Sequence, residues 1–207
     1  MLSVDELEVA RERVDGVARH PPLEYSDTFS RMTGASIHLK LEALQRTGAF
    51  KIRGAANRIS RLSPEEAAAG VVTASAGNHA QGVALAASRN DVDAKVVMPQ
   101  HAPVSKVDAT RRYGATVELH GRNYDAAQTR AHEIEAEEGR TYVHAFEDEL
   151  VMAGQGTIGL EIADDLPEVD TVVVPIGGGG LISGVATAVK GRLDDVRVVG
   201  VQAEGAD

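Results

Sequence analysis

Apolar and polar residues follow two alternating periods along this chain, and the changes of period predict an order of helices and strands. A Ser-x-x-Glu capping box at Ser3 opens a first helix that we expect to end near 18. Strict alternation over 37–41 predicts the first strand, and from Val71 onward short apolar runs alternate with helical patterns. The later predicted strands cover 71–75, 95–98, 116–119, 141–143, 171–175 and 197–201. The later predicted helices end near 62, 70, 89, 113 and 190, and two longer ones cover 124–138 and about 149–165.

This alternation predicts an α/β fold in which parallel sheets carry helices on both faces, a three-layer αβα arrangement. No linker, low-complexity segment or internal repeat interrupts the pattern. Only six residues follow the last predicted strand at 197–201. We therefore expect one face of the last sheet to lack its covering helix, in a domain that is cut short at its C-terminal end.

Composition narrows the classes of protein that the chain can represent. It has 207 residues, of which 43% are hydrophobic and only 3% aromatic, so any core is built from small aliphatic side chains. The net charge of −10 disfavours nucleic-acid binding, and the absence of cysteine excludes disulfides and thiolate metal sites. The histidines have no metal-ligand spacing, so we predict no metal. No apolar run has the length of a membrane span, which predicts a cytoplasmic protein that does not bind membranes.

The candidate chemistry begins at Lys51, which lies between Phe50 and Ile52 inside a glycine-bounded segment, 47–55. Desolvation disfavours the charged form of an amine and lowers its pKa, which makes a lysine able to form a Schiff base. A lysine with apolar neighbours is also a common surface residue whose stem lies along apolar surface. The residues downstream decide between these interpretations.

A run of four glycines between a predicted strand and a predicted helix is the second candidate. Residues 175–181 read Pro-Ile-Gly-Gly-Gly-Gly-Leu, which leaves backbone amides open to an anion at a helix N-terminus. The run matches neither a P-loop nor a dinucleotide fingerprint. A flexible turn is the alternative, but such a turn seldom needs four glycines.

The third candidate, residues 75–82, reads Ser-Ala-Gly-Asn-His-Ala-Gln-Gly and again joins a strand to a helix. Its helix N-terminus suits a carboxylate, and the Asn78 amide suits a hydroxyl or phenolate oxygen. An ordinary turn with a capped helix explains the same residues equally well.

Together, these three segments resemble those of the fold-type-II pyridoxal-phosphate enzymes, in particular the threonine dehydratase (threonine ammonia-lyase) and serine racemase group. The resemblance extends over nearly the whole chain and includes 154–159 and 172–175. It implies a tryptophan-synthase-β-like architecture with two domains: 1–40 begins the large cofactor domain, 41–145 forms the small domain, and 146–207 continues the large domain. It also implies a homo-oligomer when the protein is complete.

The resemblance implies a role for individual residues. Lys51 would hold pyridoxal 5'-phosphate as a Schiff base and then act as the acid–base at the substrate α-carbon. The other implied cofactor contacts are Phe50, Asn78, Gly177, Gly178, Gly179, Gly180 and Leu181. The implied contacts to the substrate carboxylate are Ser75, Gly77 and His79.

The implied reaction is deamination of L-threonine or L-serine by β-elimination to a 2-oxo acid and ammonia, whether for isoleucine biosynthesis or for catabolism. Racemases of this group usually carry a second serine where this chain has Ala76, so elimination is favoured. The His79 side chain disfavours a cysteine-synthase activity, because those relatives have threonine there. A shortened homologue that at most binds cofactor, and a module that binds a phosphorylated metabolite, stay open as alternatives. Ala49 replaces a serine common in relatives, and Gln202 alone does not make a cation site.

Overall fold

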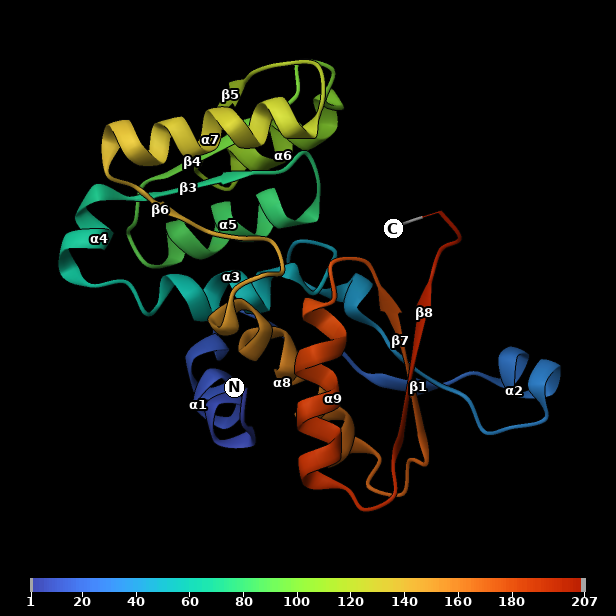
Figure 1. Cartoon of the computed structure of the whole chain (residues 1–207). Coiled ribbons are helices and arrows are strands. Elements are labelled where there is room, and N and C mark those ends of the chain that lie inside the picture. Colours follow the sequence, from blue (N-terminus) through green and yellow to red (C-terminus); the bar gives the residue numbers. More distant parts are fainter. Residues whose placement is uncertain (1, 206–207) are drawn as a thin grey trace.

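The computed structural model describes residues 2–205, which form two parallel sheets, an antiparallel pair of strands and the helices packed against them (Figure 1). The first sheet consists of β3 (Val71–Ala74), β4 (Ala94–Met98), β5 (Thr116–Leu119) and β6 (Thr141–Tyr142). Its strands are all parallel, in the order β5-β4-β3-β6. Helices α4 (Pro64–Ala69), α5 (Asn78–Arg89), α6 (Val104–Arg112) and α7 (Tyr124–Glu138) surround it.

Alternate residues of β3 and β4 enter two separate cores, which makes this sheet the middle of three layers. Val71 and Val96 pack with α5 and α6 on one face. Val72 and Val97 pack on the other face against Ala127, Ala131 and Ile134 of α7. Burial on both faces is the reason why these strands read as continuous apolar runs. The predicted three-layer α/β fold is confirmed here.

The second sheet contains β7 (Thr171–Ile176) and β8 (Arg197–Gln202), paired in parallel. Helices α8 (Glu149–Asp165) and α9 (Gly180–Arg192) cover one face, against which Val172 and Val174 are buried. Val173 is 62% exposed and Val201 54% exposed, so the opposite face is open among the described residues. The expectation of one bare sheet face is therefore confirmed.

The N-terminal part differs most from the prediction. The capping box of α1 (Val4–Val14) forms as predicted, but the helix ends at Val14 because Asp15 leaves the helical region and Gly16 takes a φ of +73°. The pattern missed β1 (Leu23–Tyr25), α2 (Asp27–Thr33) and the 3₁₀ turn Glu42–Leu44. Strand β1 pairs antiparallel with β2 (His38–Lys40), and α2 lies between them in the arm at the right of Figure 1.

Glycines at helix crossings join α3 (Lys51–Ile59), α8 and α9 into one tightly packed stack. A Cβ atom on Gly154 of α8 would lie 2.6 Å from the Cα of Gly54 in α3. A Cβ on Gly184 of α9 would lie 2.8 Å from the Cα of Gly156 in α8. Because real Cβ atoms do not approach other atoms so closely, these helices can pack at this distance only with glycine there. The stack fixes the start of α3 relative to the start of α9.

No helix within residues 2–205 combines the length and the apolar character needed to cross a membrane. The four-stranded sheet lies inside the predicted 41–145 segment, and β7 and β8 lie inside 146–207. The division of the chain into domains stays a prediction, because α3 packs against both α5 and α8.

Candidate functional site

Lys51 is the first residue of α3, and its half-buried side chain points to a backbone carbonyl instead of a carboxylate. The Nζ atom donates a hydrogen bond of 2.7 Å to the carbonyl oxygen of Ala145. It also lies 5.3 Å from the centroid of the Phe50 ring. Burial lowers the pKa of the Lys51 amine, as the sequence predicts. A neutral, nucleophilic amine is therefore easier to form here than on the surface.

Lys51 shares a cavity of about 240 Å³ with the glycine run. The cavity is lined by Phe50, Lys51, Phe146 and residues 175–181. Gly179 is the N-cap of α9; it has a φ of +82° and provides no side-chain cap for the helix amides. A helix N-terminus without a cap leaves backbone N–H donors and a partial positive charge directed at the cavity.

The four glycines serve different purposes. Gly177 has open space where a Cβ would lie, whereas Gly179 has a backbone conformation that side chains disfavour. A Cβ on Gly178 would lie 2.3 Å from the Phe146 ring, and one on Gly180 would lie 2.7 Å from the Phe146 carbonyl oxygen. Gly178 and Gly180 are therefore required by the close packing of Phe146, whether or not an anion binds to the run.

Segment 143–148 contacts all three candidate motifs, and sequence reasoning missed its part in the site. The carbonyl of Val143 accepts a bond from His79, the carbonyl of Ala145 accepts one from Lys51, and Phe146 packs on the glycine run. The Nδ1 atom of His144 accepts hydrogen bonds from the amides of Phe146 (3.2 Å) and Glu147 (2.7 Å), which fixes the turn. Every residue has a backbone carbonyl, so these contacts cannot be predicted from the sequence, and a single phenylalanine such as Phe146 does not mark a site.

The Asn78 turn lies at the start of α5 but does not line the 240 Å³ cavity. Gly77 is the N-cap without a side-chain bond, and its amide donates to the Oγ of Ser75 at 3.2 Å. Asn78 is exposed, and its Oδ1 accepts a bond from Lys106. The structure thus brings Lys51, Phe50 and the glycine run together, and places the predicted carboxylate turn beside them through the contacts of segment 143–148.

His79 is buried and cannot present its ring to a ligand. The Nε2 atom lies 3.0 Å from the carbonyl of Val143, which only accepts, so Nε2 carries the proton. Burial lowers the pKa of His79 to about 4, and the nearby Lys51 amine adds to this effect. The imidazole is therefore neutral at neutral pH, and only the backbone amide of His79 can take the predicted role toward a carboxylate.

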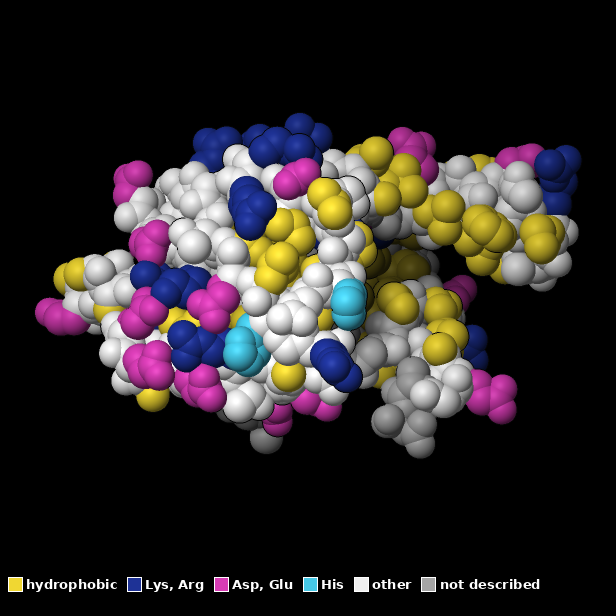
Figure 2. Space-filling model, turned by 90° about the horizontal axis from the view of Figure 1, so that it is seen from above, with side chains coloured by type: hydrophobic (Ala, Val, Ile, Leu, Met, Phe, Trp, Pro, Cys, Tyr) yellow, Lys and Arg dark blue, Asp and Glu magenta, His cyan; other side chains and the backbone are white. Residues whose placement is uncertain are grey.

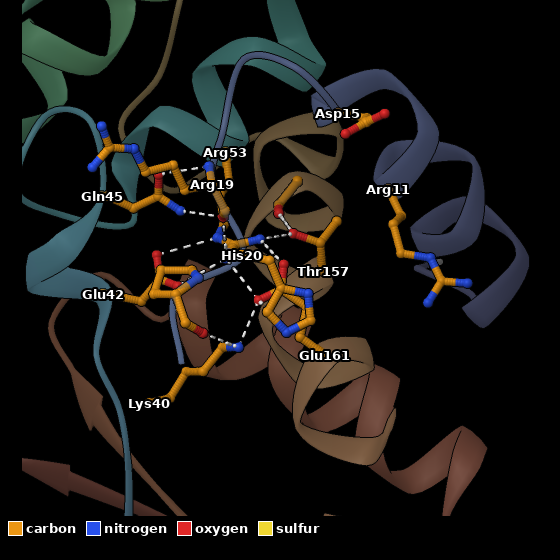
Figure 3. A network of polar contacts seen from close by, with 12 residues as sticks. Arg11, Asp15, Arg19, His20, Lys40, Glu42, Gln45, Arg53, Thr157 and Glu161 are labelled. Carbon is orange, nitrogen blue, oxygen red and sulfur yellow. Dashed lines mark hydrogen bonds and ion pairs between the residues drawn. The ribbon is translucent and has the colours of Figure 1, made fainter. Parts of the chain in front are cut away.

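A buried network around Arg53 holds α3 in place, and sequence reasoning did not identify it (Figure 3). Arg53 is 1% exposed and donates to both carboxylate oxygens of Glu42 and both of Glu161. It also donates to the Thr157 hydroxyl at 3.0 Å and the Arg19 carbonyl at 3.1 Å. Because Glu161 and Thr157 belong to α8, this network fixes the helix that begins with Lys51.

These residues fit a pyridoxal-phosphate group. The cavity is lined by an amine with a lowered pKa, by an aromatic ring beside that amine, and by a helix N-terminus that has no side-chain cap. They would serve respectively the aldehyde, the ring and the phosphate of such a molecule. A larger hollow of about 400 Å³ lies between α1, α3 and α8, but no lysine lines it, so it offers no amine for the aldehyde of this cofactor.

Comparison with known proteins defines the class. Residues 14–207 match the family described as "Pyridoxal-phosphate dependent enzyme", and the chain belongs to this family. It is 52% identical over 204 residues to the L-threonine ammonia-lyase of Thermotoga maritima, covering 99% of this chain and 51% of that protein. The predicted family and its cofactor are thus confirmed.

Solved structures agree with the fold. A processed form of threonine deaminase isoform 2 from Solanum lycopersicum superposes with a TM-score of 0.92 at 43% identity, over 98% of this chain and 55% of that one. A maize serine racemase has a TM-score of 0.96 at 37% identity, over 100% of this chain and 63% of that one. The chain spans about half the length of the curated relative that it matches. The fold-type-II architecture is confirmed.

Proposed function

We propose that this chain carries the catalytic lysine of a pyridoxal-phosphate-dependent ammonia-lyase that deaminates L-threonine, L-serine or both by β-elimination. The products are a 2-oxo acid and ammonia. One observation carries the proposal: the Lys51 amine and the uncapped start of α9 share a single cavity. The similarity to an L-threonine ammonia-lyase and to a threonine deaminase supports the choice of reaction.

When bound, pyridoxal phosphate supplies an electron sink for the electron pair left behind as the substrate α-proton departs. Lys51 would hold the cofactor through Nζ, and the amides of Gly177, Gly178, Gly179, Gly180 and Leu181 would hold its phosphate. Phe50 would pack beside the ring, and Asn78 would bond its phenolic oxygen.

Lys51 would also move the proton. Its lowered pKa favours a neutral Nζ that can accept the α-proton, because burial disfavours the ammonium form. The Ala145 carbonyl, 2.7 Å away, keeps Nζ at the cavity when the amine is free. The protonated amine could then return that proton to the departing β-hydroxyl, which must leave as water.

The turn at the start of α5 would hold the substrate carboxylate. The helix amides have no side-chain cap, so they remain available to an anion. Ser75 would contribute its hydroxyl and His79 its backbone N–H. Gly77 would contribute its backbone N–H in place of the 3.2 Å bond that this group makes to the Ser75 Oγ. Because the His79 ring is buried and neutral, it would not pair with the negative charge of the carboxylate, and the backbone amides would bind that charge instead.

Racemisation is the second candidate, because a maize serine racemase has a closely similar fold. Ala76 argues against it. A racemase needs a proton donor on the face of the cofactor opposite the lysine, and a methyl group has no exchangeable proton.

We further propose the domain division 1–40, 41–145 and 146–207, and a homo-oligomeric protein. The β1-α2-β2 arm supports self-association, since Tyr25, Phe29 and Met32 are exposed there and hydrophobic side chains follow the arm at the right of Figure 2.

The test has two stages. First, the purified chain is titrated with pyridoxal phosphate, and visible absorbance is recorded for the wild type, Lys51→Ala and Lys95→Ala. Lys95 is a matched control, because its amine is paired with Glu138 on the surface of the first sheet. The proposal expects a cofactor band in the wild type and in Lys95→Ala, and its loss in Lys51→Ala.

Second, 2-oxo acid formation is measured from L-threonine and from L-serine, with D-serine measured in parallel. Production of 2-oxo acid without D-serine supports β-elimination. A lysine-dependent cofactor band combined with D-serine as the main product would reject the lyase in favour of a racemase. A band that persists in Lys51→Ala would reject the assignment of Lys51.

A further inference from the structure

Lys106 is the one lysine of the described chain that bonds to a side-chain amide, and that amide belongs to the turn expected to contact the cofactor. Its Nζ atom donates to Oδ1 of Asn78 at 3.1 Å. Lys40 and Lys95 pair with carboxylates, whereas Lys51 and Lys190 donate to backbone carbonyls. No carboxylate within residues 2–205 pairs with Lys106.

The position of Lys106 is fixed by its own helix. It lies in the first turn of α6, and its backbone carbonyl accepts a bond of 2.9 Å from the Thr110 hydroxyl. The neighbouring Val107 and Thr110 are buried, and α6 packs against α5. The half-buried stem of Lys106 therefore holds its ammonium at the start of α5, where Asn78 begins the helix.

The chemistry of the pair decides which way the Asn78 amide faces. A lysine ammonium has three donors and no acceptor, so only the oxygen end of the amide can turn toward it. The nitrogen end then faces away, and Nδ2 has no protein partner among the described residues. A positive charge at the amide oxygen also polarises the group, which strengthens its N–H groups as donors.

We propose that Lys106 is a positioning residue that fixes the amide of Asn78 so that Nδ2–H is presented to the phenolic oxygen of pyridoxal phosphate. This inference rests on the proposed function, in which Asn78 contacts that oxygen. Without Lys106 the amide can rotate and present either its oxygen, which repels a phenolate, or its nitrogen. Lys106 itself does not touch the cofactor.

The experiment measures the dissociation constants of two probes, pyridoxal 5'-phosphate and its 3-deoxy analogue, which lacks the phenolic oxygen. Binding is followed by absorbance for the wild type, Lys106→Met, Lys106→Arg and Asn78→Ala. Lys106→Met keeps the length of the apolar stem but removes the donor, and Lys106→Arg restores a cation that only donates. Thermal unfolding without cofactor shows whether each variant is folded.

Lys106→Met should weaken pyridoxal phosphate binding by about tenfold, the loss expected for one charge-assisted hydrogen bond. The same substitution should change the dissociation constant of the 3-deoxy analogue by less than about twofold. This analogue has no phenolic oxygen, so it cannot make the hydrogen bond to Asn78 that Lys106 is proposed to orient. Lys106→Arg should restore binding of pyridoxal phosphate. In an Asn78→Ala background, Lys106→Met should have no further effect.

Two results would overturn the inference while leaving the proposed function intact. One is an equal loss for both probes, which indicates a general electrostatic or structural role for Lys106. The other is no loss for either probe. If Lys51→Ala binds pyridoxal phosphate as the wild type does, the proposed function fails, and the inference fails with it.

Discussion

His79 should contribute to a pH dependence of the stability of the cofactor-free protein, and a residue that does not titrate at this position should remove that contribution. The ring is 3% exposed, and burial lowers its pKa from 6.5 to about 4. The unfolded chain therefore binds the proton more tightly than the folded one. Stability is lost as the pH falls below 6.5, and the loss is complete near the folded-state value of about 4.

The size of the effect follows from those two values. Their full separation corresponds to about 3 kcal/mol of unfolding free energy. Between about pH 7 and about pH 5, His79 alone should account for a loss of roughly 2 kcal/mol. The substitution His79→Gln keeps an N–H donor near the Val143 carbonyl but does not titrate, so its stability should fall by that much less over the same interval.

Urea unfolding followed by far-ultraviolet circular dichroism at the two pH values measures this difference. Thr73→Val is the matched control, because the buried Thr73 hydroxyl donates to the same Val143 carbonyl at 2.9 Å and does not titrate. Thr73→Val should lower stability by about 1 kcal/mol at both pH values, leaving the pH dependence of the wild type unchanged. If the unfolding free energies of the wild type and His79→Gln fall by the same amount between the two pH values, the buried His79 ring does not have a lowered pKa.

Other predictions concern the helix stack and the glycine run. Arg53→Met should lower the unfolding free energy by about 3 kcal/mol, because it leaves the half-buried Glu42 carboxylate without its cation and the buried Glu161 carboxylate with Lys40 as its main remaining partner. Arg130→Met on the exposed surface of α7 should have a much smaller effect in the same urea titration. Gly54→Ala should cost at least about 2 kcal/mol, since its Cβ would lie 2.7 Å from a carbonyl of α8, and wild-type stability would contradict the close crossing. Gly178→Ala should weaken pyridoxal phosphate binding measured by absorbance, and Phe146→Leu should partly restore it; no restoration would mean that the clash is not with that ring.

Much of the fold follows from local patterns. The predicted bounds of 124–138 and 149–165 match α7 and α8, because each helix has an N-cap side chain, Asn123 or Asp148. Apart from Thr73 and Lys95, strands β3 and β4 are apolar on both faces, which is typical of a buried parallel sheet. In the arm, the alternation over 37–41 predicted β2, whereas β1 was missed because its three residues are too few for a period to show.

The site was only partly predictable. Lys51 and the glycine run stand out because amine chemistry and anion binding need those residue types, and the structure places them in one cavity. The contacts of Ala145 and Val143 use backbone carbonyls, which any residue possesses. Arg53 appears in the sequence as one arginine among many, and only the fold reveals that it is buried between Glu42 and Glu161.

Under the proposed function, Lys51 is the residue that binds the cofactor covalently. The protein saturated with pyridoxal phosphate is reduced with borohydride, digested, and mapped by mass spectrometry. The chain has only five lysines, so each possible site can be distinguished. We expect a single stable adduct on the peptide that contains Lys51, and its loss in Lys51→Ala. An adduct mainly on another lysine, or equal labelling of Lys51→Ala, would contradict it.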